Sequence, residues 1–324
     1  MDRYIPYVHK IKEVLFLLQN LNQFIQRYMP IFPLLCIVTG VVFDEISSKL
    51  IILIPFIFAF MTFASSLNMR FRDVGVFKKY PKTILFTIAF LHIIMPVWAY
   101  FLSELLFDDP LLTVGFVISV AVPTGVTSLI WVAMCRGNIP LSLAIILIDT
   151  LLAPVMLPLL VHIVAGQTIE IDTVSIMIDL LWMIVVPSIV AIFVNEWGNQ
   201  AFNMKLKANL PLFSKLALFS IITINSSVIA PFVKDFSVEL LGVVALVLVL
   251  ALSGYALAFL VAHYTWRDKE TKISFIFNAG MRNIAVGVVI ATSYFPPTVA
   301  MPVVFGMLFQ QVLASFFAKI VVKW

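Results

Sequence analysis

The chain has 324 residues, of which 62% are hydrophobic and only 12% are charged, and its mean hydropathy is +1.08. A soluble domain is about 45–50% apolar and about 25% charged, so this composition excludes a soluble enzyme, a nucleic-acid binder and a disordered chain. The formal net charge of +4 does not indicate nucleic acid as a partner, because the basic residues are distributed as in a membrane protein. Cys36 and Cys135 lie in or beside apolar stretches, so we expect neither a disulfide framework nor a metal cluster.

Residues 1–28 mix apolar side chains with Arg3, Lys10, Lys12 and Arg27, which predicts an amphipathic helix lying on the membrane face. We expect no cleavable signal peptide, because no small-residue cleavage site follows a compact apolar core. A membrane-spanning helix needs about 20 mostly apolar residues. Ten stretches of this kind follow, at residues 31–47, 49–69, 83–105, 111–135, 138–164, 172–194, 211–233, 237–264, 271–293 and 297–320.

The basic residues support ten spans with both termini in the cytoplasm, as in a multi-pass protein of the plasma (inner) membrane. Short cytoplasmic loops carry an excess of Lys and Arg. With the N-terminus inside, nearly all of the 21 basic residues fall on the cytoplasmic side, and only Lys49 and Lys234 fall outside. Arg282 lies inside the ninth span. The longest connection, residues 195–210, is predicted to be a short loop with no room for a second soluble domain.

Ten spans divide into two halves of five, residues 29–165 and 166–324. A repeated half with an odd number of spans enters the membrane in the opposite orientation, which is the inverted repeat of many secondary transporters. Prolines recur at a fixed offset between the halves, as in Pro30 and Pro187. The predicted fold is therefore an all-α polytopic membrane protein with ten transmembrane helices in a five-plus-five inverted repeat.

The fourth and ninth spans hold equivalent places in the two halves, and both are interrupted. Pro123 and Gly125 break the fourth, since proline removes a backbone donor and glycine weakens a helix. Gly280, within a polar run from Asn278 to Asn283, breaks the ninth. Helices broken inside a membrane expose backbone groups that can hold ions or anionic substrate groups. A simple kink is the alternative, but it does not explain the polar side chains at both breaks.

Residues 122–158 resemble the bile acid:sodium symporter family of secondary transporters, with Pro123, Ser128, the Arg136-Gly137-Asn138 turn and Pro154 among the matching positions. Residues 277–291, which contain Gly280 and Met281, resemble the same family. With the ten-span layout, the resemblance covers essentially the whole chain. It implies a core domain and a panel domain, interleaved across both repeats, with broken helices 4 and 9 crossing near the substrate and sodium sites.

By this resemblance Na⁺ is the expected coupling ion, and no organic cofactor is expected. The family's sodium positions are only partly kept, at Ser128, Ser142, Asn278 and Met281. Family members place a carboxylate at the position of Asn278 and a glutamine at that of Arg282. They also carry oxygen-bearing side chains where this chain has Leu129 and Ile146. Because hard cations need several oxygen donors, the residues argue against the usual coupling to sodium.

Arg282 and Asp149 are predicted to be the two charged residues deep in the membrane. An ionised side chain at mid-bilayer costs about 3 to 17 kcal/mol and is nearly always paired or faces water. We therefore hypothesise that Arg282 takes the place of a sodium ion, with Asp149 as its partner or neighbour. A purely structural salt bridge is the alternative.

Arg282 is also a candidate for binding substrate, because a guanidinium offers a planar fork that grips carboxylate or phosphate. Amides and hydroxyls near the breaks and in the tenth span could orient the rest of an anion, although any of them could instead be a structural hydrogen bond. The candidate substrate-binding residues are Thr127, Ser128, Asn278, Arg282, Asn283, Gln310 and Gln311.

The sequence thus predicts a secondary active transporter that moves a small organic anion by alternating access. A sodium-independent carrier, proton-coupled or uniport, is the alternative within transport, and His92 and Asp149 are then the two plausible titrating groups. His92 could instead bond a carbonyl beside Pro96. A membrane enzyme using the same pair for acid–base chemistry would need a nucleophile or metal, and the sequence indicates neither. A channel would need a continuous ring of polar residues along its path, whereas the fourth and ninth spans concentrate their polar residues at one level.

Overall fold

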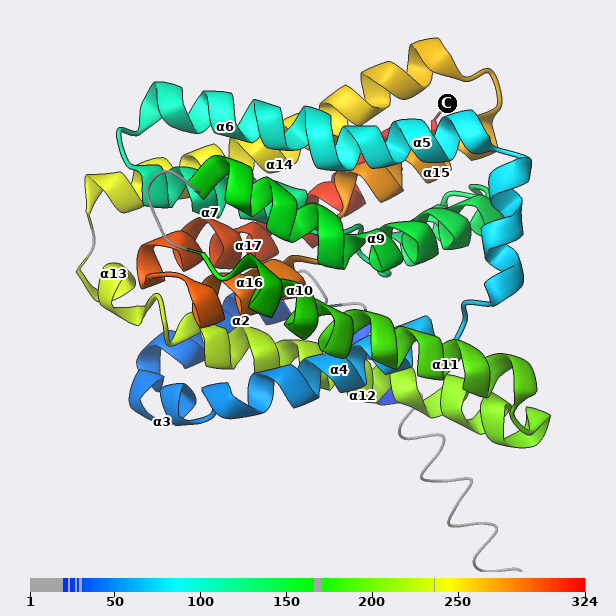
Figure 1. Ribbon diagram of the computed structural model, residues 1–324, viewed down its shortest axis with the longest axis horizontal. Coiled ribbons are helices and arrows are strands. Elements are labelled where there is room, and N and C mark those ends of the chain that lie inside the picture. The colour runs from blue at the N-terminus through cyan, green and yellow to red at the C-terminus, as the bar shows by residue number, and fades with distance from the viewer. Residues whose placement is uncertain are drawn as a thin grey trace, which may run out of the picture.

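In this computed structural model, residues 20–22, 24–26, 28, 31–165, 171–235 and 237–323 are described, and their regular structure is helical (Figure 1). The predicted all-α class is therefore confirmed. The amphipathic helix predicted for residues 1–28 lies mostly outside the described residues.

Within the described part of the chain, six helices are long and apolar enough to cross a membrane, and a seventh span results if a pair bent by 62° counts as one. The bent pair joins Ile51–Ser66 to Phe71–Lys78. The six are α5–η3–α6 (Pro81–Ala89, Phe90–Ile94, Met95–Leu106), α9 (Ile139–Ala165), α10–η4–α11 (Thr173–Leu180, Leu181–Val185, Val186–Trp197), α12 (Gln200–Ser226), α14 (Val238–Thr265) and α17 (Pro297–Val322).

The remaining predicted spans are helical but short or interrupted. They are α2 (Phe32–Val42), α4 (Ile54–Ser66), α7 with α8 (Pro110–Ala121, Ser128–Met134) and α15 with α16 (Lys269–Gly280, Ile284–Tyr294). The coarse prediction of a multi-pass membrane protein therefore holds. Ten spans in an inverted repeat stay a prediction, because length and composition alone identify six or seven.

Two of the long helices contain a π-helical turn directly before a proline. Turn η3 precedes Met95-Pro96, and η4 precedes Val186-Pro187. The proline ring clashes with the carbonyl four residues before it and offers no N–H. A π turn widens the helix at that point and relieves the conflict. As a result, η3 carries the buried side chain of His92 at a local irregularity of the helix.

The loop predicted for residues 195–210 is wrong. Helix α12 begins at Gln200, where the side chain of Asn199 accepts hydrogen bonds from the N–H groups of Ala201 and Phe202. A search for apolar stretches does not find residues 200–210, because α12 begins with a polar part before its apolar part. Lys207 lies there and donates to Asn195 at 2.6 Å. Of the short elements, η2 (Phe71–Lys78) lies in a predicted connection, whereas α3 (Asp44–Lys49), η1 (Ile51–Leu53) and α13 (Ala230–Lys234) lie within or at the ends of predicted spans.

The helices form two packed groups. One group contains α2, α4, α11 and α12, which lie together in the lower part of Figure 1. The other contains α6, α7, α9, α14, α15 and α17, above them in the same view. The helices approach closely where the sequence has glycine: a Cβ on Gly115 of α7 would lie 2.5 Å from the carbonyl oxygen of Val299 on α17. Helix α16 contacts members of both groups.

Candidate functional site

The two helix interruptions, between α7 and α8 and between α15 and α16, cross, and their backbones pair with each other. This region, residues 122–127 and 281–283, is called the crossing below. Thr124, between α7 and α8, forms an isolated antiparallel bridge with Arg282, between α15 and α16. The N–H of Gly125 donates to the carbonyl of Met281 at 3.3 Å, and the N–H of Asn283 donates to the carbonyl of Pro123 at 2.7 Å. Non-helical backbone inside a membrane is tolerated only where its polar groups are satisfied or line a cavity. Here each break satisfies the other.

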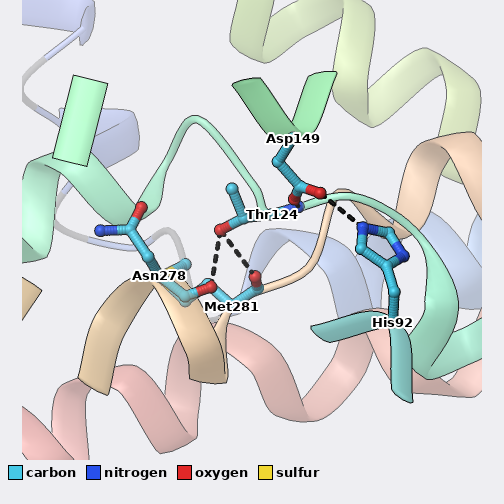
Figure 2. Close-up of polar contacts among 5 residues, drawn as sticks. All are labelled: His92, Thr124, Asp149, Asn278 and Met281. Carbon is cyan, nitrogen blue, oxygen red and sulfur yellow. Dashed lines mark hydrogen bonds and ion pairs between the residues drawn. The ribbon is translucent and has the colours of Figure 1, made fainter. Parts of the chain in front are cut away.

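Side chains add to this pairing. The hydroxyl of Thr124 donates to the carbonyls of Asn278, at 2.7 Å, and Met281, at 3.2 Å, as Figure 2 shows. Two glycines permit the close approach. A Cβ on Gly125 would lie 2.9 Å from the carbonyl oxygen of Arg282, and a Cβ on Gly280 would lie 2.4 Å from the ring of Tyr255.

Asp149 joins the crossing to a histidine. One of its carboxylate oxygens lies 2.5 Å from His92 Nε2, and the other accepts the backbone N–H of Thr124 at 2.6 Å (Figure 2). The side chains of His92 and Asp149 are both fully buried. The direct partners of Asp149 are thus His92 and Thr124, whereas Arg282 interacts with it only through space.

The guanidinium of Arg282 has no hydrogen-bonding or ion-pairing partner among the described residues. The residue is 7% exposed, and its Nη1 atom is buried without an acceptor. Its backbone carbonyl, in contrast, accepts a hydrogen bond from the side chain of Gln310. A buried charge without a partner is costly, so the position requires an anion or water that the protein itself does not supply.

Arg282 lines a cavity of about 870 Å³ between the two helix groups. Two cationic side chains, Arg282 and Lys215, line it, and none of its described lining residues is a carboxylate. The polar lining combines hydroxyls and amides with these cations. These neutral residues are Asn22, Gln26, Thr62, Ser65, Ser66, Asn68, Thr127, Thr150, Ser188, Ser214, Asn283, Gln310 and Gln311. Several apolar side chains, Trp131 among them, complete the wall.

Five of the seven predicted substrate residues line this cavity: Thr127, Arg282, Asn283, Gln310 and Gln311. The other two, Ser128 and Asn278, are fully buried and bonded to each other instead. Gln311 accepts a hydrogen bond from the indole of Trp131 at 3.2 Å. The predicted residues are therefore brought to one region, but Ser128 and Asn278 do not face the cavity.

Sequence reasoning missed the opposite wall of the cavity. Ser66 of α4 and Ser188 of α11 meet there, with their hydroxyls 3.0 Å apart. Small polar residues within an apolar span were the available signal. Lys215 is one of the basic residues predicted on the cytoplasmic side, and it lines the cavity and donates to Asn22 and Gln26 at 2.8 and 2.5 Å.

A further aspartate also lies within one of the predicted spans. Asp179 lies within the predicted span 172–194, is half-buried, and accepts a hydrogen bond from the hydroxyl of Tyr294.

Comparison with known proteins decides the family. A family model described as the sodium bile acid symporter family matches residues 55–236. The Bacillus subtilis protein YbaS is 40% identical over 89% of this chain and 95% of its own length. The chain belongs to the sodium bile acid symporter family.

Two further relatives carry transporter names. The Bacillus subtilis protein named "Uncharacterized sodium-dependent transporter YocS" is 25% identical over 95% of this chain and 96% of its own length. The Arabidopsis thaliana protein named "Probable sodium/metabolite cotransporter BASS1, chloroplastic" is 26% identical over 74% of this chain and 59% of its own length. The sodium bile acid symporter family is thus one of sodium-linked secondary transporters, and this member is not an enzyme.

The family implies sodium, so the oxygens at its sodium positions matter. The hydroxyl of Ser128 donates to Asn278 Oδ1 at 3.0 Å, and Asn278 Nδ2 donates to Ser142 Oγ at 2.9 Å and to the carbonyl of Ser274 at 2.7 Å. The carbonyl of Met281 already accepts from Thr124 and Gly125. Asn278 Oδ1, Ser142 Oγ and the Met281 carbonyl therefore accept hydrogen bonds from protein donors, and the Ser128 hydroxyl is turned toward Asn278. The Asn278 amide also brings N–H groups to a place where a cation would need oxygen. The residues present do not fit a sodium ion in this family member.

Proposed function

We propose that this protein is a secondary transporter that moves a small organic anion across the plasma membrane by alternating access, with Arg282 as the anchor for the anionic group. The observation that carries the proposal is the buried guanidinium that finds no acceptor in the described part of the protein. A guanidinium presents paired N–H donors that match carboxylate or phosphate oxygens. Because none of the described residues that line the cavity is a carboxylate, an anion is the ligand that the charge of the cavity favours.

The size and lining of the cavity suggest the kind of anion. A volume of about 870 Å³ falls in the range of sites for drug-sized ligands, about 300–1,000 Å³. Amides of Asn283, Gln310 and Gln311 line the cavity together with the cation, and so do apolar side chains such as Leu218 and Met307. An organic acid that carries both hydroxyl or amide groups and an apolar portion satisfies each of these surfaces.

The proposed architecture has ten spans in two inverted halves, 29–165 and 166–324, with residues 1–28 on the membrane face and both termini in the cytoplasm. The crossing supports an inverted repeat. Thr124 bonds Met281, which lies 157 residues along the chain, the same offset as between Pro30 and Pro187. Equivalent residues of two inverted halves meet where the two-fold axis passes through the molecule.

Alternating access follows from the place of the cavity. The group of α2, α4, α11 and α12 is the proposed panel domain, and the remaining spans are the proposed core domain. The cavity lies between them, with Ser66 and Lys215 on the panel side and Thr127 and Arg282 on the core side. Rocking of the core against the panel would then close this opening and expose the anchored anion to the other side of the membrane.

We further propose that transport does not require sodium. Arg282 supplies a fixed positive charge in the region where relatives of this family place a glutamine, and Asn278 replaces the family's carboxylate. The Ser128–Asn278–Ser142 hydrogen bonds support this reading, because they complete the coordination of those oxygens without an ion.

Proteoliposomes containing the purified protein provide the test. Exchange of a radiolabelled anion against the same unlabelled anion, screened over carboxylates and phosphate monoesters, measures binding and reorientation together. We expect Arg282→Gln to weaken the transported anion's affinity roughly ten- to hundredfold, because a hydrogen-bonded charge contributes about 1.5–3 kcal/mol. The affinity of Arg282→Lys for the anion should lie between those of wild type and Arg282→Gln, because lysine keeps the positive charge but lacks the planar paired N–H donors of the guanidinium.

Arg267→Gln is the matched control, because Arg267 is an exposed arginine in the connection between α14 and α15. It should exchange at the wild-type rate. Equal exchange by wild type and Arg282→Gln would contradict the anion site. Accumulation driven by an imposed sodium gradient would contradict the sodium-independent mechanism while leaving the anion site in place.

A further inference from the structure

We infer that the buried pair of His92 and Asp149 binds a proton that crosses the membrane together with the anion, which makes the transporter an electroneutral proton–anion symporter. This inference rests on the proposed anion site at Arg282. It assigns the coupling ion that the occupied oxygens at the sodium positions leave open.

The pair is built as a proton site. His92 and Asp149 are 2.5 Å apart and fully buried, so a hydrogen lies between Nε2 and the carboxylate, and no water competes for it. The second ring nitrogen of His92, Nδ1, is buried and has no partner among the described residues. Histidine is the side chain whose charge changes most readily near neutral pH, and ionisable groups within membrane helices commonly form proton pathways.

The pair is physically connected to the anion site. Asp149 also accepts the backbone N–H of Thr124, and Thr124 is bridged to Arg282 at the crossing. A change in the charge of the pair therefore acts on the residue that holds the anion, both through this backbone link and through the electrostatic attraction between Asp149 and Arg282. Thr124 is the common element of both sites.

The charged and titratable groups around the pair are few. Arg282 faces Asp149, and Tyr255 of α14 faces Arg282 across a small cavity of about 40 Å³ that both residues line. Asp179 of α10 is engaged by Tyr294. The remaining charged or titratable groups on the helices packed around the pair and the crossing lie toward the helix ends or on η2. They include Arg72, Asp73, Lys78, Lys82, Tyr100, Glu104, His162, Glu239, His263, Tyr264, Lys269, Glu270, Lys272 and Lys319.

Counting charges at the crossing gives the stoichiometry. In the empty site, Arg282 carries one positive charge, Asp149 one negative charge, and neutral His92 none, so the crossing is balanced. A singly charged anion at Arg282 leaves one net negative charge inside the membrane. One proton added at Nδ1 of His92 gives an imidazolium–carboxylate pair and restores the balance, and no bond of the substrate changes. Because net charge inside a bilayer is costly, the doubly loaded state and the empty state are the two that reorient.

The experiment uses the full-length protein in proteoliposomes and the anion identified by exchange. A pH difference of about one unit, acid on the side of the labelled anion, should sustain about a tenfold accumulation at one proton per anion, the ratio equivalent to one pH unit. An imposed membrane potential should leave this accumulation unchanged. Accumulation that follows the potential and ignores pH would overturn the inference.

Asp149→Asn separates coupling from substrate binding. With the carboxylate removed, Arg282 and the anion balance each other, so anion exchange should persist. The empty variant carries a positive charge and cannot return, so net accumulation driven by pH should be lost. Asp149→Asn that exchanges the anion and still accumulates it with the pH gradient would disprove the role of the pair.

A second variant and a control keep the test decisive. His92→Gln should lose most of its anion exchange, because Arg282, Asp149 and the anion then leave one net negative charge and no imidazole takes up the balancing proton. Exchange at the wild-type rate together with accumulation driven by pH would count against the pair, so this variant decides the question if Asp149→Asn fails to fold. Asp179→Asn is the control, because Asp179 is a second aspartate of a membrane helix outside the crossing, and it should keep both activities. Failure of wild type to exchange any anion would count against the proposed function, whereas exchange without proton coupling would count against this inference alone.

Discussion

Arg282 determines the chemistry of the crossing at the scale of single residues. It is a cation held at 7% exposure without an acceptor in the described residues, beside an aspartate whose oxygens are already used by His92 and Thr124. In an empty site the charge of Asp149 balances that of Arg282, but the buried guanidinium still lacks an acceptor for its N–H groups, which is costly. The arrangement is therefore best explained by a ligand that supplies the missing acceptor during part of the transport cycle.

Thr124 provides the first test at this scale. Its hydroxyl donates to the carbonyls of Asn278 and Met281. Thr124→Val keeps the shape and removes this donor, whose single hydrogen is shared between the two carbonyls, so the free energy of unfolding should fall by roughly 0.5–1.5 kcal/mol, the net contribution of one hydrogen bond. Thermal unfolding in detergent measures the change. Thr292→Val is the control, because that hydroxyl only bonds carbonyls of its own helix, and a matching loss there would argue against a special role for Thr124.

Single-residue roles were only partly predictable. The polar runs around Pro123 and Gly280 predicted where the helices would break, because proline and glycine act locally. The contact of His92 with Asp149 joins residues 57 positions apart, and local sequence gives no signal for such a contact. Of the two predicted relations of Asp149 to Arg282, direct partner or neighbour, the longer-range attraction fits the neighbour.

At the scale of elements, the crossing depends on how closely the broken helices approach their neighbours. Gly280 ends α15, and its backbone lies against the ring of Tyr255 on α14. Any side chain there has to displace Tyr255 or move the break, because an added Cβ would come within 2.4 Å of the ring. Overpacking of this kind typically costs about 1–3 kcal/mol.

Gly280→Ala tests this dependence. We expect the variant to unfold at a lower temperature and to exchange the anion at least about tenfold more slowly, the effect of about 1.4 kcal/mol on a rate. Gly75→Ala is the matched control, because no atom lies within 4 Å of the corresponding Cβ on η2. If both variants behaved like wild type in unfolding and exchange, the close packing of the crossing would be irrelevant to function.

The lengths of the apolar stretches predicted which helices form better than they predicted the residues at which the helices begin and end. All ten predicted ranges fall on helical segments, because the cost of burying polar backbone in lipid leaves a strong sequence pattern. The first turns of α12, before Pro211, are polar and so lack this apolar pattern. Hydropathy alone cannot distinguish a polar or amphipathic extension of a helix from a loop. The π turns before Pro96 and Pro187 were also invisible to an apolar count.

At the scale of the whole molecule, the proposed panel and core enclose one cavity, and both proposed binding events take place on the core side of it. The anion binds at Arg282, and the proton binds at His92 and Asp149, on the other side of the bridged backbone. Both ligands act on the same crossing, so their binding is expected to be reciprocal: each raises the affinity for the other by the same factor. The large cavity could not be predicted from sequence, because residues of α4, α11 and α12 form one wall and their contact with the core depends on tertiary packing.

The most direct test of the central claim is an experimental structure of the protein with its exchanged anion bound. We predict that the carboxylate or phosphate oxygens lie within hydrogen-bonding distance of the Arg282 guanidinium, inside the cavity that Gln310 and Asn283 also line. An anion held elsewhere in the cavity, with the guanidinium still lacking an acceptor, would contradict the account.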